Sequence, residues 1–261
     1  MIIDEDKSQK LTTLAFNAGQ EIIRIYNKKV TKKLKSDNSP VTNADLKANS
    51  IICAGLKKYF PKIPIVSEEL DNSHIKNKKI FWLVDPLDGT KEFLKGNGEF
   101  TVNIALIINK KPIYGLIYMP AKNKFYYTQS KKSYFAKFDQ KGKLRNIKVI
   151  KVKKRMKNIL VFSRSHGLSK EKMLEARKTV FKKFNANKII RSGSSIKLCY
   201  IADGTANIYP RHGRTMEWDI AAGDAILRYA GGRIKTLDRK IMKYGTVSYT
   251  HLRAHETKAN L

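Results

Sequence analysis

Two aspartates three residues apart, Asp85 and Asp88, are the residues of this chain best placed to do chemistry. The preceding five residues, 80–84, are a continuous apolar run, which is typical of a strand buried on both faces. We therefore expect both carboxylates at the C-terminal end of an interior strand, where Gly89 and Thr90 turn the chain towards a helix. Carboxylates this close repel each other unless a cation lies between them, and their oxygens are ligands that suit Mg²⁺. The N–H groups at the start of the following helix favour a phosphate.

An ordinary acidic turn is the alternative for an isolated Asp-x-x-Asp-Gly pattern, because Asp and Gly are common turn residues. Further carboxylates favour the metal interpretation. Glu68 and Glu69 form an acidic pair upstream, and Asp219 stands at the predicted start of a helix whose small residues 221–223 allow close packing. Taken alone, Asp219 is equally well explained as the N-cap of that helix.

Three blocks of the chain resemble signatures of the inositol monophosphatase superfamily of Mg²⁺-dependent, lithium-sensitive phosphatases. DPLDGT (85–90) resembles its metal-site signature, residues 217–223 resemble its W-D-x-A-A-G signature, and SEE (67–69) resembles its acidic metal-binding turn. The blocks occur in the family's order, and the similarity extends from about residue 10 to about residue 245. The resemblance implies a layered α-β-α-β-α sandwich.

A finer resemblance connects the chain to the bacterial 3'(2'),5'-bisphosphate nucleotidase branch of this superfamily. The segments that carry it are DPLDGTKEF, GEFTVNIALI, SRSH and GSSIK. Inositol monophosphatases usually have Asp-Gly-Thr-x-Asn-Phe where this chain has Lys91, Glu92 and Phe93 after Thr90. The branch is therefore expected to differ from them in substrate.

The resemblance also implies which oxygens hold two or three Mg²⁺ ions. Asp85 bridges two ions, Glu68 and the carbonyl of Leu87 complete the first site, and Asp88 and Asp219 complete the second. Two divalent ions can activate water, neutralise the phosphoryl oxygens and stabilise the leaving oxygen.

Thr90 and Asp45 are the predicted catalytic pair. In the family, the threonine after Asp-Gly pairs with an aspartate from the segment that corresponds to VTNAD, residues 41–45. Such a pair can orient a water and accept its proton. Taken alone, Asp45 is also explained as a first-turn carboxylate favoured by the helix dipole. We expect Glu69 to lie next to the metal ligands without binding the metal.

Six residues are predicted to bind the substrate. Gly89 and Thr90 are expected to hold the phosphate that is hydrolysed. Four further positions match nucleotide-contacting residues of related bisphosphate nucleotidases: His166, Ser194, Lys197 and Arg211. Each of the four has a structural alternative, namely a loop histidine, a helix cap and two surface charges.

Hydrophobic periodicity predicts an α/β fold with two lobes. We expect helices over 11–26, 43–60, 169–184, 195–203 and 219–229, and strands over 100–108, 113–119, 124–128, 133–136, 159–162, 188–191, 206–209 and 233–237. Residues 1–155 form an N-terminal lobe with the metal-site turn and an antiparallel meander, and residues 156–246 form an α/β lobe with the substrate residues. The tail, 247–261, matches nothing in the family and resembles read-through at a truncated gene end, so we expect it to lie outside the fold.

The chain has 261 residues and a formal net charge of +31, which favours an anionic partner. The lysines, however, are spread through nearly every segment, so we expect no nucleic acid and a positive field that attracts a phosphorylated small molecule. No apolar run reaches the roughly 18 residues that span a membrane, and the N-terminus does not resemble a signal peptide. We expect a cytoplasmic protein with reduced Cys53 and Cys199. Peripheral contact with the inner membrane stays open, as does the choice between monomer and homodimer.

The function that the resemblance implies is Mg²⁺-dependent hydrolysis of the 3'-phosphate of 3'-phosphoadenosine 5'-phosphate, which in the family clears a by-product of sulfate assimilation. An inositol monophosphatase or broad sugar phosphatase is the alternative within the superfamily. An inactive, basic nucleic-acid-binding protein is the alternative from another class.

Overall fold

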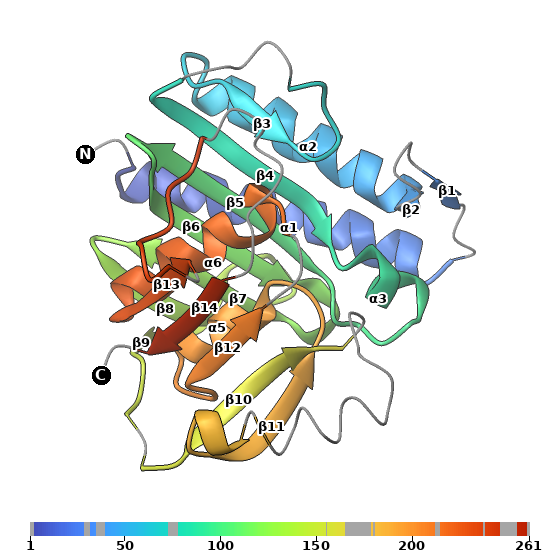
Figure 1. Cartoon of the computed structure of the whole chain (residues 1–261). Coiled ribbons are helices and arrows are strands. Elements are labelled where there is room, and N and C mark those ends of the chain that lie inside the picture. Colours follow the sequence, from blue (N-terminus) through green and yellow to red (C-terminus); the bar gives the residue numbers. More distant parts are fainter. Residues whose placement is uncertain are drawn as a thin grey trace.

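The computed structural model describes residues 3–28, 32–34, 40–72, 78–154, 156–164, 179, 181–211, 215–236, 238–245 and 255–259. Helices and two sheets are stacked in layers (Figure 1). The helices are α1 (Glu5–Tyr26), α2 (Asn43–Tyr59), α3 (Thr90–Leu94), α5 (Ile196–Ala202) and α6 (Glu217–Tyr229), with a 3₁₀ turn η1 (Pro120–Lys122). A small hairpin pairs β1 (Lys32–Leu34) with β2 (Pro40–Thr42).

The larger sheet has seven strands in the order β3-β4-β5-β6-β7-β8-β9. Their bounds are β3 (Ile65–Ser67), β4 (Ile80–Asp88), β5 (Thr101–Ile108), β6 (Lys111–Met119), β7 (Lys124–Gln129), β8 (Lys132–Phe138) and β9 (Leu144–Ile150). Strands β3 and β4 are parallel, and the other neighbours are antiparallel. The predicted meander is therefore confirmed, and β9 extends it by a strand that we did not predict.

Strand β4 is buried on both faces because its side chains alternate between two hydrophobic cores. Trp82 and Val84 face a core formed with α1 and α2, whereas Phe81 and Leu83 face the core that contains α5 and α6. Asp85 continues the second set by the same period of two, so it points towards the layer of α6.

Helices α1 and α2 pack on one face of the seven-stranded sheet, and α6 packs on the other, between the two sheets (Figure 1). Helix α6 lies unusually close to β6. A Cβ at Gly115 would lie 2.4 Å from the carbonyl oxygen of Ala222, and a Cβ at Gly223 would lie 2.3 Å from Leu198 on α5. The small residues predicted beneath the site therefore do allow close packing, and they fix the position of α6.

The second sheet has five strands in the order β11-β10-β12-β14-β13. Their bounds are β10 (Asn158–Ser163), β11 (Ala186–Ser192), β12 (Ile208–Arg211), β13 (Gly232–Thr236) and β14 (His255–Ala259). Strand β10 is parallel to β11 and β12, and β14 is antiparallel to β12 and β13. For β14 the structure differs from our expectation that the whole tail lies outside the fold, because its backbone completes the ladder between β12 and β13.

The predicted helix over 169–184 falls mostly outside the described residues. The division of the chain at residue 155 stays a prediction. The two predicted lobes share one hydrophobic core, in which Leu83 of β4 lies with Ile220 of α6.

Candidate active site

Two parallel strands bring the predicted acidic residues to one edge of the larger sheet. Strands β3 and β4 pair from Ile65 to Ser67, and both end at this edge. Glu68 follows β3 directly, and its N–H donates to the carbonyl of Val84, the neighbour of Asp85 (3.1 Å). The sequence positions of Glu68 and Asp85 are therefore adjacent in space because their strands are paired in register.

Helix α6, which packs on the face of the larger sheet opposite α1 and α2, contributes the carboxylate of Asp219. Asp219 is the third residue of α6, and its Oδ2 accepts hydrogen bonds from the Thr215 hydroxyl (2.7 Å) and the Met216 N–H (3.0 Å). Oxygens of Asp85, Asp88 and Asp219 all lie within 4.8 Å of one another. Among the described residues, this is the one group of acidic, histidine or cysteine side chains close enough to share a metal ion. Asp219 is not the N-cap itself, since Met216 holds that position.

Burial and mutual repulsion determine the electrostatics of the cluster. Burial raises the pKa of Asp85 well above its usual value, and the charges of Glu68 and Asp88 raise it further. Burial and the same two neighbours raise the pKa of Asp219 to about 7. Glu68 is outside the 4.8 Å group, and its negative charge contributes to the raised pKa of both aspartates.

These residues fit a hard divalent cation. The donors are carboxylate oxygens on rigid elements, and the carbonyl of Leu87 lies in the same turn. A bound cation would relieve the repulsion that raises the pKa values of Asp85 and Asp219. The cluster can therefore bind a metal ion.

Thr90 and Asp45 meet next to this cluster although they are 45 residues apart. The Thr90 hydroxyl lies 3.2 Å from Oδ1 of Asp45 and 3.3 Å from the Leu87 carbonyl. Oδ2 of Asp45 accepts from the N–H (2.8 Å) and the hydroxyl (2.5 Å) of Thr42, the N-cap of α2. Both interpretations of Asp45 thus describe the same side chain: one oxygen caps the helix and the other faces Thr90. Burial raises the pKa of Asp45.

A glycine shapes the turn after the predicted metal ligands Asp85 and Asp88. Gly89 has φ of +91°, and a Cβ there would lie 3.1 Å from the Glu99 carbonyl oxygen and 3.3 Å from Ser194. After Gly89 the chain enters α3, as the sequence predicted. The position predicted to approach a phosphate is thus one that only glycine fills without strain.

The predicted substrate residues differ in their burial and in their contacts. Lys197 is almost fully buried at 3% exposure; its ammonium donates to the Ser194 carbonyl and lies 5.4 Å from the centre of the Tyr209 ring. Arg211 is partly buried and donates to the Tyr209 hydroxyl (3.0 Å). Burial opposes the charge of Arg211, yet contact with Tyr209 and the charges of nearby carboxylates raise its pKa. The surface-charge alternative is therefore wrong for Lys197, and the two cations converge on Tyr209.

Ser194 contacts the carboxylate cluster directly. Its hydroxyl donates to Oδ2 of Asp88 (2.7 Å), and the N–H of Ser195 donates to the same oxygen (2.5 Å). It does not act as the predicted helix cap, because Ser195 holds the N-cap position of α5. His166 lies outside the described residues. Glu69 is partly buried at the turn after β3.

Sequence reasoning missed three residues of this region: Tyr209, Glu99 and Arg164. Tyr209 was visible only as an apolar strand residue, and its contacts with Lys197 and Arg211 come from folding. Glu99 and Arg164 lie within segments that carry the resemblance, GEFTVNIALI and SRSH, which was the one available signal.

The layered fold and the carboxylate cluster define an α/β protein with a candidate divalent-cation site. A sequence model of the inositol monophosphatase family matches residues 4–260. The chain belongs to the inositol monophosphatase family.

Relatives within this family carry a more specific name. The 3'(2'),5'-bisphosphate nucleotidase CysQ of Buchnera aphidicola is 45% identical over 231 residues, which cover 87% of this chain and 83% of the relative. The protein of the same name from Shigella flexneri is 40% identical over 235 residues, covering 88% and 91%. The crystal structure of CysQ from Bacteroides thetaiotaomicron superposes with a TM-score of 0.82 at 34% identity and covers 99% of both chains. Within the described residues, no helix is long and apolar enough to cross a membrane.

Proposed function

We propose that this chain is a Mg²⁺-dependent 3'(2'),5'-bisphosphate nucleotidase that removes the 3'-phosphate of 3'-phosphoadenosine 5'-phosphate, giving AMP and phosphate. The observation that carries the phosphatase chemistry is the cluster of Asp85, Asp88 and Asp219 next to the hydrogen-bonded pair of Thr90 and Asp45. The nucleotide substrate is supported by the name shared by relatives that are 45% and 40% identical over most of the chain.

The proposed metal ligands are Glu68, Asp85, the Leu87 carbonyl, Asp88 and Asp219, which hold two or three Mg²⁺ ions. When bound, Mg²⁺ supplies charge neutralisation on the phosphoryl oxygens and lowers the pKa of a water.

The residues of the chain orient the reacting groups. The hydroxyl of Thr90 orients the attacking water, and the carboxylate of Asp45, 3.2 Å away, accepts the proton through that hydroxyl. Asp45 can serve as the acceptor because its other oxygen is fixed by Thr42, which leaves Oδ1 aimed at Thr90. Gly89 gives the phosphate room to approach the backbone of the turn.

The second phosphate of the nucleotide is assigned to the cations at Tyr209. Arg211 can bind a phosphate with two parallel N–H donors, and Lys197, whose ammonium lies 5.4 Å from the centre of the Tyr209 ring, adds a second positive charge. His166 completes the proposed nucleotide site. An inositol monophosphate has no second phosphate for these groups, so the cations favour the bisphosphate.

The proposed location, cellular role and lithium sensitivity follow from the same assignment of substrate and metal. We place the enzyme in the cytoplasm, where it clears a by-product of sulfate assimilation and is inhibited by lithium. Its substrate is a small molecule rather than a nucleic acid. A monomer and a homodimer, with or without peripheral membrane contact, are both compatible with this function.

A phosphate-release assay tests the proposal. Purified protein is supplied with Mg²⁺, with and without lithium, and with 3'-phosphoadenosine 5'-phosphate, its sulfated form or inositol 1-phosphate. We expect lithium-sensitive release from the bisphosphate with a kcat/KM at least about tenfold above that for inositol 1-phosphate, equivalent to about 1.4 kcal/mol of selective stabilisation. Preference for inositol 1-phosphate would return the chain to the alternative within its family. Absence of Mg²⁺-dependent release from all three substrates would contradict the phosphatase proposal.

A further inference from the structure

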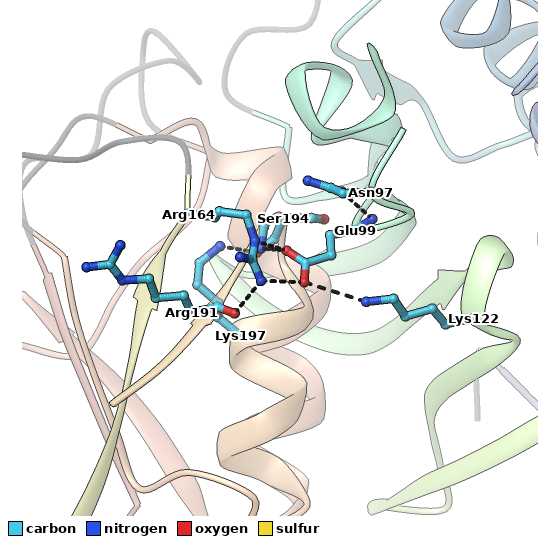
Figure 2. Close-up of polar contacts among 8 residues, drawn as sticks. Asn97, Glu99, Lys122, Arg164, Arg191, Ser194 and Lys197 are labelled. Carbon is cyan, nitrogen blue, oxygen red and sulfur yellow. Dashed lines mark hydrogen bonds and ion pairs between the residues drawn. The ribbon is translucent and has the colours of Figure 1, made fainter. Parts of the chain in front are cut away.

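Glu99 is a nearly buried carboxylate that the proposed chemistry leaves without a role. It is 7% exposed and lies two residues before the start of β5. The guanidinium of Arg164 binds it with two parallel hydrogen bonds, from Nε to Oε2 (2.7 Å) and from Nη2 to Oε1 (2.9 Å). Lys122 approaches Oε1 within 3.5 Å, and Figure 2 shows Arg164 and Lys122 reaching Glu99 from opposite sides. Two cations therefore fix the orientation of one carboxylate.

The oriented carboxylate holds the backbone of a turn in the other half of the chain. Oε2 of Glu99 accepts a hydrogen bond from the N–H of Gly193 (2.8 Å). Arg164 also donates to the carbonyl of Arg191 (2.9 Å), so the end of β11 is held at two points. A Cβ at Gly193 would lie 2.5 Å from Cγ of Glu92 and 2.9 Å from the Glu99 carbonyl oxygen. The turn thus packs directly against the segment that carries Glu99.

The two residues that follow Gly193 are the ones that bind Asp88. Ser194 has φ of +50°, a conformation that is unfavourable for a residue with a side chain unless its surroundings enforce it. In that conformation the Ser194 hydroxyl and the Ser195 N–H both donate to Oδ2 of Asp88, at 2.7 Å and 2.5 Å. Both donors use Oδ2, so they fix the orientation of the Asp88 carboxylate, which lies in the cluster with Asp85 and Asp219.

We propose that Glu99, held by Arg164, is a positioning residue for the metal site: it fixes the turn 193–195 so that Ser194 and Ser195 hold Asp88 in the orientation that binds a divalent cation. This inference rests on the proposed function, since it assigns a role within that site. Groups that orient metal ligands through hydrogen bonds commonly change metal affinity by ten- to a hundredfold when removed.

The structural alternative is an ion pair that merely stabilises the fold. It predicts a lower melting temperature and an unchanged affinity for the metal. Positioning predicts the reverse pattern, with metal affinity affected more than the stability of the metal-free protein. The Arg164 side chain is 44% exposed to solvent, so water can solvate its charge if Glu99 is replaced.

The test is a calorimetric titration of Mg²⁺ into the whole purified protein without substrate, for wild type and Glu99→Gln. Glutamine keeps the size of the side chain but loses the negative charge and one of the two acceptor oxygens, so it cannot accept both hydrogen bonds of the Arg164 fork. We expect about tenfold weaker Mg²⁺ binding, an equal rise in the Mg²⁺ concentration for half-maximal activity, and recovery of most turnover at saturating Mg²⁺. Arg164→Lys, which retains the charge and loses the fork, should give a shift in the same direction, and it replaces Glu99→Gln if that variant does not fold.

Glu21→Gln is a matched control. Glu21 on α1 is bound by the same two-bond fork from Arg24, at 2.8 Å and 2.6 Å, on the helix layer that covers the opposite face of the larger sheet. The Glu21→Gln variant should bind Mg²⁺ with the same affinity as wild type. Wild-type Mg²⁺ affinity in both Glu99→Gln and Arg164→Lys would overturn the proposal, as would an equal loss in Glu21→Gln. If wild type hydrolysed none of the phosphates, the proposed function would fail, while the Mg²⁺ titration would still decide the positioning role.

Discussion

The hydroxyl of Ser194 donates a 2.7 Å hydrogen bond to Oδ2 of Asp88, and the two residues are 106 positions apart in the sequence. Asp88 ends β4 of the larger sheet, whereas Ser194 lies between β11 of the smaller sheet and α5. A residue that the family resemblance assigns to the nucleotide thus touches a residue that it assigns to the metal. The candidate metal site and the candidate nucleotide site therefore meet at Ser194, and a substitution of Ser194 is expected to affect both.

Asp85→Asn should abolish phosphatase activity without destabilising the metal-free protein. Asp85 is 1% exposed, and its carboxylate is surrounded by acidic neighbours that raise its pKa. A neutral amide relieves that repulsion and can keep the hydrogen bond from the Leu87 N–H (3.1 Å). We expect turnover to fall by at least about a hundredfold, as for the loss of a key electrostatic group, with a melting temperature in EDTA equal to or above that of wild type. Turnover within about tenfold of wild type would exclude a bridging role for Asp85.

Thr90→Ala should lower kcat by about a hundredfold or more, because it removes the hydroxyl that lies between Asp45 and the turn. Thr90→Ser is the matched control, since it retains the hydroxyl and should keep most of the turnover. Steady-state kinetics at saturating Mg²⁺ separate this effect from a change in metal affinity. If the Ser and Ala variants were equally impaired, the methyl group rather than the hydroxyl would be the important part of Thr90.

The stability of the metal-free protein should fall as pH rises from about 5 to 8. The folded-state pKa of Asp219 is about 7, above its ordinary value of 3.8, and that of Asp85 is also raised. A carboxyl group with a raised pKa stabilises the fold while it is protonated, and this contribution is lost as pH rises through the folded-state pKa. Thermal unfolding in EDTA across this range measures the effect, and Asp219→Asn should flatten the profile.

Saturating Mg²⁺ should remove or reverse that trend, because the cation binds the deprotonated carboxylates more tightly as pH rises. A wild-type profile that is the same with Mg²⁺ and with EDTA would mean that these carboxylates do not bind the metal.

The fold was predictable where a local pattern decides the element. The four strands β5 to β8 have apolar patterns and short turns, and all four were predicted. Strand β9 was missed because its sequence LRNIKVI leaves most side chains exposed, so no apolar pattern marks it. It is a strand because β8 offers a free edge for pairing, which is a property of the folded sheet.

The candidate site was predictable where motifs are contiguous, as in 85–90 and 217–223. Long-range contacts were not predictable. Glu99 is 65 residues from Arg164 and 94 from Gly193, and nothing in the residues near Glu99 indicates either partner. The burial of Lys197 was missed for a related reason: a lysine at a helix start is usually exposed, and here the Tyr209 ring covers it.

Deleting residues 247–261 should lower the melting temperature while leaving turnover at low temperature largely unchanged. The deletion removes β14, whose backbone pairs with β12 and β13, but none of the proposed site residues. We expect a fall of at least about 4 °C, which corresponds to roughly 1 kcal/mol or more in a chain of this size. Thr257→Pro should act in the same direction, because proline removes a ladder N–H, and Thr257→Val is its control. An unchanged melting temperature in the deletion would mean that β14 is not needed in the sheet.

Arg211→Ala should raise KM for 3'-phosphoadenosine 5'-phosphate far more than KM for inositol 1-phosphate. Arg211 is a cleaner test than Lys197, because the buried ammonium of Lys197 also holds the carbonyl of Ser194 in the turn next to Asp88. Both substrates present the phosphate that is hydrolysed, but only the nucleotide carries a second phosphate that needs its own cationic partner. Losing a charge-assisted hydrogen bond weakens binding by about 1.5–3 kcal/mol, or about ten- to a hundredfold.

The control for this substitution must separate a local contact from the net charge of +31. Arg233→Ala removes the same charge from an exposed position on β13, so it should leave both KM values within about twofold of wild type. The assays belong near physiological ionic strength, where attraction over more than about 8 Å is screened. Tyr209→Phe should give a smaller increase than Arg211→Ala, because it removes the 3.0 Å hydrogen bond that orients Arg211 but keeps the cation. Equal losses on both substrates in Arg211→Ala would show that Arg211 supports the metal site or the fold, and the preference for a bisphosphate would then need another source.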